Sequence, residues 1–265
     1  MDNIGITGAS GFIGNNVVRF LAEKGHKIIA FGRDSKRNFE HENVEWRICN
    51  LDKISKRDFK GVGKLIHFAG AYNAQDAFSK NVVMLRKVLE AAHEAEVERV
   101  YLISTYAVFG DRKVPAETNA PYSPLEAYSM SKVIGEEKFI KFIEGGKIKG
   151  TIIRSCSLYG KYGKNFIDII LQRINEGEEI QMVYFQNQFL HVDDFSKEIL
   201  KIIEIENPER FYNIEGEIIT QQTLKEIFEE GKIKYSLIDQ KARSYLCKGN
   251  KPLITQTVKN YILKK

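Results

Sequence analysis

Short apolar runs alternate with longer amphipathic segments over the first 160 residues. The runs are rich in β-branched residues and are bounded by glycine, charged or turn residues, which is typical of strands buried in a parallel sheet. They predict strands at residues 4–7, 27–31, 44–48, 64–68, 100–104 and 151–154. A helical period predicts helices at residues 12–24, about 81–95 and about 127–143, and residues 49–63 form at most a helical turn. This alternation predicts an α/β fold with a doubly wound parallel sheet and helices on both faces.

The pattern is less regular after Gly160. It predicts helices near residues 165–176 and 194–205, a further helix between the last two strands and another at the end of the chain. Strands are expected near residues 180–184, 211–214 and 235–238. No repeat or flexible linker interrupts the sequence. We therefore predict an α/β domain at residues 1–160 and a small mixed α/β lobe at residues 161–265, between which the chain can weave.

A glycine-rich turn follows the first strand directly and opens the first helix. Gly8 permits a tight turn, Gly11 lets the backbone approach a pyrophosphate, and Gly14 packs the helix against the strand, as in a Rossmann-type dinucleotide fold. A turn of purely structural purpose is the alternative, but the strand–loop–helix context favours the ligand site. The cofactor-binding candidates from this turn are Gly8, Ser10, Gly11, Phe12, Ile13 and Gly14.

The end of the second strand indicates which dinucleotide is used. A carboxylate there binds the ribose 2′-hydroxyl of NAD, whereas a basic residue accommodates a 2′-phosphate. Gly32 occupies this position, Arg33 follows, and Lys36 and Arg37 add positive charge. Asp34 has the sequence spacing expected for NAD but falls past the strand end. The pattern favours NADP(H), with NAD(H) as the alternative, unless the basic residues are only a solvated loop.

Tyr128 and Lys132 are four residues apart in a predicted helix, so that their side chains lie on one face. A phenol has an ordinary pKa of about 10 and is a poor acid or base at neutral pH. A neighbouring ammonium group favours the phenolate and lowers that pKa. Taken alone the pair is a weak signal, because both residues are common on helix surfaces.

Composition is that of an ordinary globular protein, with 43% hydrophobic and 28% charged residues. No apolar run approaches the roughly 20 residues that span a membrane, and the amino terminus lacks the features of a signal peptide. Three separated cysteines without metal-ligand spacing indicate reduced thiols, a cytoplasmic location and no metal site. A net charge of +5 suits an anionic small molecule such as a dinucleotide and is too diffuse for nucleic acid.

Eight motifs occur in order along the chain, from residue 3 to about residue 215. They are Gly8-Ala-Ser-Gly-Phe-Ile-Gly14, Cys49-Asn-Leu-Asp52, His67-Phe-Ala-Gly70, Asn81, Ser104-Thr-Tyr-Ala-Val-Phe-Gly110, Tyr128-Ser-Met-Ser-Lys132, Arg154-Ser-Cys-Ser-Leu-Tyr-Gly160 and His191-Val-Asp-Asp194. The ordered set resembles the extended short-chain dehydrogenase/reductase family, specifically its NAD-dependent epimerase/dehydratase group, which acts mainly on nucleotide sugars. The resemblance implies that residues 1–160 are a dinucleotide-binding Rossmann domain and residues 161–265 a substrate-binding lobe.

The resemblance implies a role for each matched residue. Tyr128 is expected to exchange a proton with the substrate oxygen, and Thr105 to hydrogen-bond the reacting carbonyl. Lys132 is expected to hold the nicotinamide ribose and to lower the pKa of Tyr128. Asn81 is expected to brace the active-site helix, unless it is a helix-terminal polar group. Further cofactor-binding candidates are Asn50 and Leu51 near the adenine, and Phe68, Ala69, Gly70, Ser104, Tyr128 and Lys132 along the cofactor.

The substrate candidates are Tyr72, Thr105, Tyr106 and Asn165, although the two tyrosines could equally pack beneath a loop. Two departures from the family pattern narrow the chemistry. Family dehydratases carry an Asp-Glu pair after the catalytic threonine, where this chain has Tyr106 and Ala107. Many relatives carry an arginine shortly before the position of His191 that contacts the substrate diphosphate, and residues 186–190 contain none.

The sequence thus predicts an NADP(H)-dependent reductase of a keto group on a nucleotide sugar, of the 4-keto-6-deoxy type, or on a similar ketone. The alternative is a nucleotide-sugar 4-epimerase that uses tightly held NAD. A third hypothesis is an NADP-sensing regulator without turnover. The presence of Thr105, Tyr128 and Lys132 together counts against it, because a sensor has no chemical need for them. The expected partners are a small-molecule substrate and a second copy in a homodimer, with neither nucleic acid nor membrane.

Overall fold

The computed structural model describes residues 3–33, 39–146 and 148–263. Its centre is a parallel sheet of seven strands, in the order β10-β6-β5-β4-β1-β2-β3 within these residues. The sheet confirms the predicted doubly wound α/β fold and all six strands expected in the first part of the chain. The strands are β1 (Asn3–Thr7), β2 (Ile28–Gly32), β3 (Val44–Ile48), β4 (Val62–His67), β5 (Arg99–Thr105), β6 (Lys149–Ser155) and β10 (Phe211–Ile214).

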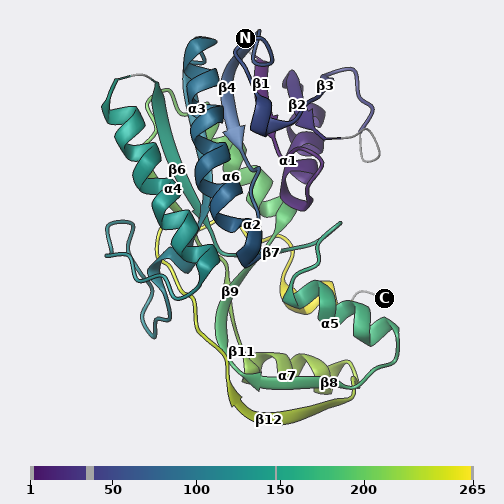
Figure 1. Cartoon of the computed structure of the whole chain (residues 1–265). Coiled ribbons are helices and arrows are strands. Elements are labelled where there is room, and N and C mark those ends of the chain that lie inside the picture. Colours follow the sequence, from purple (N-terminus) through teal and green to yellow (C-terminus); the bar gives the residue numbers. More distant parts are fainter. Residues whose placement is uncertain (1–2, 34–38, 147, 264–265) are drawn as a thin grey trace.

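Helices cover both faces of this sheet (Figure 1). One face carries α1 (Phe12–Glu23) and α6 (Val192–Glu204), and the other carries α3 (Leu85–Glu94) and α4 (Ala127–Glu144). Because apolar residues of the central strands are buried on both sides, the sheet needs helices on both faces to exclude water. A large apolar core lies on each side.

The helix expected at residues 81–95 begins earlier and is irregular. It starts with α2 (Ala74–Phe78), continues as a π-helical turn (Ser79–Met84) and then becomes α3. Such π-helical turns are rare and often occur at functional sites. The weak crossover at residues 49–63 contains the expected helical turn, a 3₁₀ turn at Leu51–Lys53. A second 3₁₀ turn, Tyr106–Phe109, follows β5.

A smaller lobe lies below the carboxyl ends of the strands and has its own apolar core (Figure 1). In this lobe β12 pairs with β8, while β11, β9 and β7 form a three-stranded sheet. The strands β7, β9 and β11 were not expected from the sequence. The elements are β7 (Ser157–Tyr159), α5 (Phe166–Asn175), β8 (Ile180–Tyr184), β9 (Gln186–His191), β11 (Glu217–Thr220), α7 (Gln221–Glu230), β12 (Tyr235–Lys241) and α8 (Val258–Leu263).

The expected division at residue 160 is not a division in space. Helix α6 packs against α1, and β10 pairs with β6 in parallel register from Phe211 to Ile214. Both elements follow residue 160 in the sequence but belong to the large sheet and its helical layer. The chain therefore weaves between the two parts.

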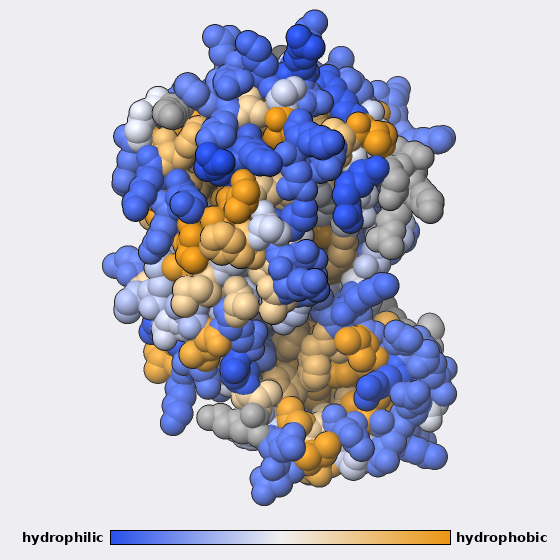
Figure 2. All heavy atoms as spheres, in the orientation of Figure 1, coloured by the Kyte–Doolittle hydropathy of each residue, from blue (hydrophilic) through white to orange (hydrophobic). Residues whose placement is uncertain are grey.

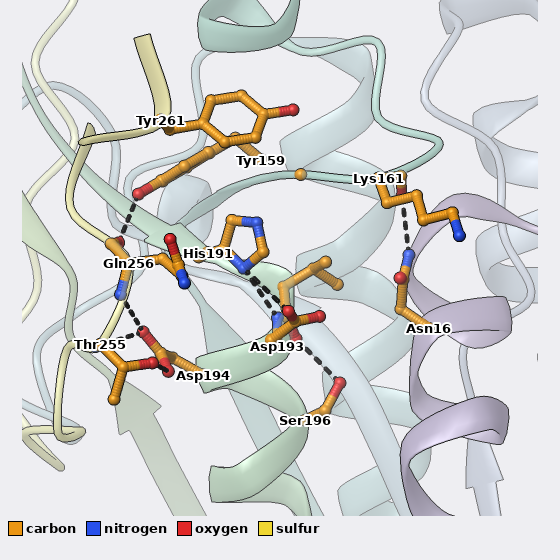
Figure 3. Close-up of polar contacts among 12 residues, drawn as sticks. Asn16, Tyr159, Lys161, His191, Asp193, Asp194, Ser196, Thr255, Gln256 and Tyr261 are labelled. Carbon is orange, nitrogen blue, oxygen red and sulfur yellow. Dashed lines mark hydrogen bonds and ion pairs between the residues drawn. The ribbon is translucent and has the colours of Figure 1, made fainter. Parts of the chain in front are cut away.

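Residues 242–257, which we call the strap, return from β12 toward the large sheet. Buried Gln188 holds the strap by accepting from the Cys247 N–H at 2.8 Å and donating to the Cys247 carbonyl at 3.1 Å. Further along, the Asp194 carboxylate accepts from the Thr255 N–H at 2.7 Å and the Gln256 N–H at 3.2 Å (Figure 3). The strap thus ties the lobe to α6. No helix in the described part of the chain is long and apolar enough to cross a membrane.

Candidate active site

A cavity of about 700 Å³ lies between the carboxyl edge of the large sheet and the lobe. Figure 2 shows a hollow between these two parts. Open α/β sheets bind ligands at this edge, where the strand order reverses. The cavity lining comes from the start of α1, the segment after β4, the end of β5, the start of α4, the β7–α5 segment and the strap.

The glycine turn has the shape that a dinucleotide phosphate requires. Gly8 has a φ of +70°, and a Cβ atom there would lie 2.7 Å from the Ala69 nitrogen. A Cβ atom at Gly14 would lie 2.3 Å from the Gly8 carbonyl oxygen. Gly11 is the N-cap residue of α1 and has no side chain to cap its first N–H groups. These residues fit a pyrophosphate, because the backbone is close-packed and the helix presents free donors and a favourable dipole.

Thr105, Tyr128 and Lys132 meet at one corner of the cavity. Thr105 ends β5, and the other two lie one turn apart on α4, as their spacing predicted. The phenol of Tyr128 hydrogen-bonds to Thr105. The Lys132 ammonium donates to the Ile103 carbonyl at 2.7 Å. A hydroxyl, a phenol and an ammonium group therefore converge on one space.

The expected lowering of the Tyr128 pKa is wrong in this structure. Burial and the neighbouring Tyr72 phenol raise that pKa to about 12, against a lowering effect of the Thr105 hydrogen bond. Burial lowers the pKa of Lys132 to about 8, although the negative charge of Glu136 opposes the change. Burial is the largest cause of both shifts, because it disfavours the charged form of each group. At neutral pH Tyr128 is therefore a proton donor and Lys132 is mostly protonated.

Asn81 braces the active-site helix, as expected. It lies inside the π-helical turn, not at a helix end, and is buried. Its carboxamide accepts from the Ala71 N–H at 3.0 Å and donates to the Ala71 carbonyl at 2.9 Å and to the Ser131 hydroxyl at 2.9 Å. Ser131 in turn donates to the Tyr128 carbonyl at 2.6 Å. This chain of bonds links the segment after β4 to the helical turn that carries Tyr128.

The structure brings many of the other predicted residues to the same cavity. Those that line it are Phe12, Ile13, Phe68, Gly70, Tyr72, Ser104, Tyr106 and Asn165. Others lie outside its lining, and these are Gly8, Ser10, Gly11, Gly14, Arg33, Asn50, Leu51 and Ala69. The strand ends of β2 and β3 are adjacent, since the Cys49 N–H donates to the Gly32 carbonyl at 2.9 Å. Arg33 is exposed there, whereas Asp34, Lys36 and Arg37 are outside the described residues.

Three of the predicted residues that line the cavity also form hydrogen bonds within the protein. Buried Tyr106 donates its hydroxyl to the Gln188 carbonyl at 2.8 Å and accepts from the Ser157 N–H at 3.0 Å. Its contact with substrate stays a prediction. The Ser104 hydroxyl donates to Glu136, and the Asn165 carboxamide donates to the Leu158 carbonyl. Their side chains are therefore positioned by the fold before any ligand is considered.

Tyr72 is different, because 75% of it is exposed and its ring lies 4.7 Å from the Tyr128 ring. It forms a wall beside the phenol and remains a candidate for substrate contact.

Sequence reasoning missed several lining residues, which are Glu126, Lys164, Phe166 and Tyr245. Tyr245 reaches the cavity on the strap, where its N–H donates to the Asn187 carboxamide oxygen at 2.6 Å. Glu126 forms an ion pair with Arg243 of the strap. Asn187 and Gln188 stand in the segment where many relatives have the diphosphate-binding arginine, and here their side chains hold the strap. Glu126 could have been found two residues before Tyr128, but the strap gave no signal in the sequence.

Comparison with known proteins decides the family. The family model described as the NAD dependent epimerase/dehydratase family matches residues 4–214. The chain belongs to this family. A candidate UDP-glucose 4-epimerase of Methanocaldococcus jannaschii is 26% identical over 224 residues, which are 76% of this chain and 73% of the relative. The dTDP-4-keto-6-deoxy-D-glucose reductase of Streptomyces niveus is 24% identical over 163 residues, 61% of this chain and 54% of the relative.

A solved structure has the same fold. The UDP-glucuronic acid 4-epimerase of Bacillus cereus, in complex with UDP-glucuronic acid and NAD, superposes with a TM-score of 0.86 at 14% identity and covers 99% of both chains. The resemblance inferred from the motifs is therefore confirmed, as is the Rossmann-type fold. The chain is an enzyme of the extended short-chain dehydrogenase/reductase type, in a family with epimerases, reductases and dehydratases. Within the described residues, no cluster of three or more His, Cys, Asp or Glu side chains could hold a metal ion.

Proposed function

We propose that this family member is an NADP(H)-dependent reductase of a keto group on a nucleotide sugar, of the 4-keto-6-deoxy type, or on a similar ketone. One observation carries the proposal. Tyr128, which hydrogen-bonds to Thr105, lines the cavity at the carboxyl edge of the sheet together with Lys132. Ketone reduction needs a proton donor at the substrate oxygen, and a phenol with a pKa of about 12 is in the donor form at neutral pH.

The residues of this chain divide the work of the reaction. NADPH, when bound, supplies the hydride that the carbonyl carbon receives. The Thr105 hydroxyl accepts from the Ala107 N–H at 3.2 Å, which leaves its own proton for the substrate oxygen. Tyr128 donates its proton to that oxygen as negative charge develops on it. In this proposal the Lys132 ammonium stabilises the phenolate that results and binds the ribose hydroxyls.

The glycine turn and the amino terminus of α1 hold the pyrophosphate in this proposal. Arg33, exposed directly after β2, binds the 2′-phosphate of NADP(H). Gly32, the last residue of β2, offers no carboxylate to the 2′-hydroxyl of NAD.

A 4-epimerase is the second candidate, because relatives with epimerase names are similar over most of the chain. An epimerase must first remove a proton from a substrate hydroxyl, so it needs Tyr128 as a phenolate. The raised pKa of Tyr128 opposes that first step. Elimination of water is not supported, since Tyr106 and Ala107 replace the acid pair of family dehydratases and Tyr106 is buried. The NADP sensor remains the third candidate.

A nucleotide sugar as substrate is supported by the names of relatives. The chain spans 73% of the length of the Methanocaldococcus jannaschii relative and 54% of the length of the Streptomyces niveus reductase. A homodimer and a cytoplasmic location remain predictions.

A paired assay tests the proposal. Purified protein is incubated with NADPH and dTDP-4-keto-6-deoxyglucose, and separately with NAD and UDP-glucose, with product analysis in both cases. We expect NADPH consumption in the first reaction only. Tyr128→Phe should abolish turnover while NADPH affinity changes little. Protein that carries NAD(H) through purification and does not oxidise NADPH would contradict the reductase, and activity that survives in Tyr128→Phe would remove Tyr128 from its role.

A further inference from the structure

Helix α4 presents three polar side chains on one face at successive turns, namely Tyr128, Lys132 and Glu136. Each contacts one of the last three residues of β5. Tyr128 bonds to the Thr105 hydroxyl, the Lys132 ammonium donates to the Ile103 carbonyl at 2.7 Å, and the Ser104 hydroxyl donates to the Glu136 carboxylate. The first two contacts belong to the site already described. The third contact involves Glu136, to which the proposed reaction assigns no role.

The Glu136 carboxylate is buried and surrounded by hydrogen-bond donors. It is 0% exposed. Arg154 on β6 donates its Nε to both carboxylate oxygens at 3.1 Å and its Nη2 to Oε2 at 2.7 Å. The Tyr122 hydroxyl donates to Oε2 at 2.7 Å. With Ser104, these donors come from three segments around the helix, so the carboxylate has one fixed location.

Glu136 also supplies the negative charge that acts on Lys132 from its own helix, one turn away. The other titratable groups near the ammonium do not replace this charge. His67 on β4 is neutral, because burial and the Lys132 charge lower its pKa to about 3. Tyr128 is protonated at neutral pH. Arg154 is positive and forms an ion pair with Glu136 itself.

We propose that Glu136 is a positioning residue for the reduction, on the condition that the proposed function holds. Its carboxylate fixes the end of β5 against α4 through Ser104, which sets the distance between Thr105 and Tyr128. The same carboxylate keeps Lys132 protonated at the pH at which the enzyme works. Arg154 neutralises the buried charge, and a buried carboxylate requires such a partner.

The charge effect is tested on the protein without substrate, so the test does not depend on the proposed function. Lysine labelled with ¹³C at Cε is titrated by NMR, and the Lys132 signal is assigned by its loss in Lys132→Arg. Because burial lowers the pKa of Lys132 to about 8, we expect its signal to titrate apart from those of exposed lysines, whose pKa is about 10.4. In Glu136→Gln we expect the titration midpoint of Lys132 to fall by about 1 pH unit or more. The matched control is Tyr122→Phe, which removes a donor to the same carboxylate but no charge and should leave the midpoint unchanged. An unchanged midpoint in folded Glu136→Gln overturns the proposal.

Ser104→Ala tests the geometric effect and covers the case in which Glu136→Gln does not fold. This variant keeps the buried ion pair and the other two contacts between β5 and α4, and removes only the hydrogen bond from Ser104 to Glu136. We expect kcat to fall about tenfold or more, as for loss of one hydrogen bond to a charged group, with KM for NADPH within about twofold. Tyr122→Phe should retain kcat. A Ser104→Ala kcat equal to that of the wild type overturns the proposal. Wild-type protein that turns over no ketone contradicts the proposed function instead and leaves the titration as the deciding test.

Discussion

Replacing Gly14 by alanine tests the cofactor site through one methyl group. The new Cβ would lie 2.3 Å from the Gly8 carbonyl oxygen and 3.1 Å from the Ala9 Cα. Ordinary contacts of a Cβ atom begin at 3.4 Å, so the turn and the helix must separate by about 1 Å. The Gly8 carbonyl also accepts from the Gly11 N–H at 2.9 Å and is therefore part of the turn itself. The displacement falls on the backbone that is expected to bind the pyrophosphate.

The size of the effect follows from the clash. Overpacking of a close-packed site costs about 1–3 kcal/mol. If the turn bears this cost, NADPH affinity falls by about 5- to 150-fold. A Cβ atom at Gly11 would lie 3.1 Å from the same carbonyl oxygen, so Gly11→Ala should have a smaller effect. Gly145, which follows α4, is the matched control, because its φ is −69° and its nearest contact would be 3.4 Å.

Fluorescence titration with NADPH measures the affinity of the three alanine variants, and denaturant unfolding measures their stability. We expect Gly145→Ala to bind NADPH as tightly as the wild type, Gly11→Ala to bind it more weakly, and Gly14→Ala to bind it most weakly. Wild-type affinity in Gly14→Ala would refute the assignment of this turn to the phosphate. Equal losses of affinity in all three variants would show that the clash distance does not determine binding.

Three further predictions concern charged side chains. Arg33→Ala should weaken NADPH binding and leave NADH binding unchanged in parallel titrations; equal losses would mean that the 2′-phosphate is not bound there. Arg154→Met should lower the free energy of unfolding by about 3–5 kcal/mol and the Tm by roughly 6–20 °C, because it leaves the Glu136 carboxylate buried without its partner. As a control, Arg210→Ala removes a half-exposed ion pair with Glu144 and should lower the free energy of unfolding by less than about 1 kcal/mol. Equal losses of stability in the two variants would contradict the prediction that the buried ion pair matters more. Catalysis should decline as pH rises through about 8, because Lys132 has a lowered pKa and loses its proton there, whereas a pH–rate profile that stays level above that pH would contradict its role.

The large sheet could be predicted from the sequence because its signals are local. Each of the six strands before residue 160 is a short apolar run, and each connecting helix has its own period. The glycine turn at residues 8–14 is also a local signal, because its glycines lie within seven residues of one another. The pair Tyr128 and Lys132 is local as well, since one helical turn separates the two residues. These features predicted the fold, the family and three residues that the structure places at one corner of the cavity.

The lobe and the electrostatics were not predictable in this way. Strand β9 begins with polar residues 186–188, and its partners β7 and β11 are far away in the sequence, so no local alternation identified it. Gln188 is buried because the strap, which returns from the far side of the lobe, offers a backbone N–H and carbonyl to its side chain. The same long-range packing brings Tyr245 to the cavity.

The sequence by itself determined which chemical groups the site contains: a phenol, an ammonium group and a hydroxyl at fixed local spacing. Only the tertiary structure decided their charge states. Tyr128 was expected to have a lowered pKa because Lys132 is near, but the pKa depends on how much water the fold leaves around each group. That burial, and the donors from β5, β6 and the segment before α4 that hold the Glu136 carboxylate, arise from parts of the chain outside the helix. In this fold, burial thus favours the neutral phenol of Tyr128 and lowers the pKa of Lys132 to about 8.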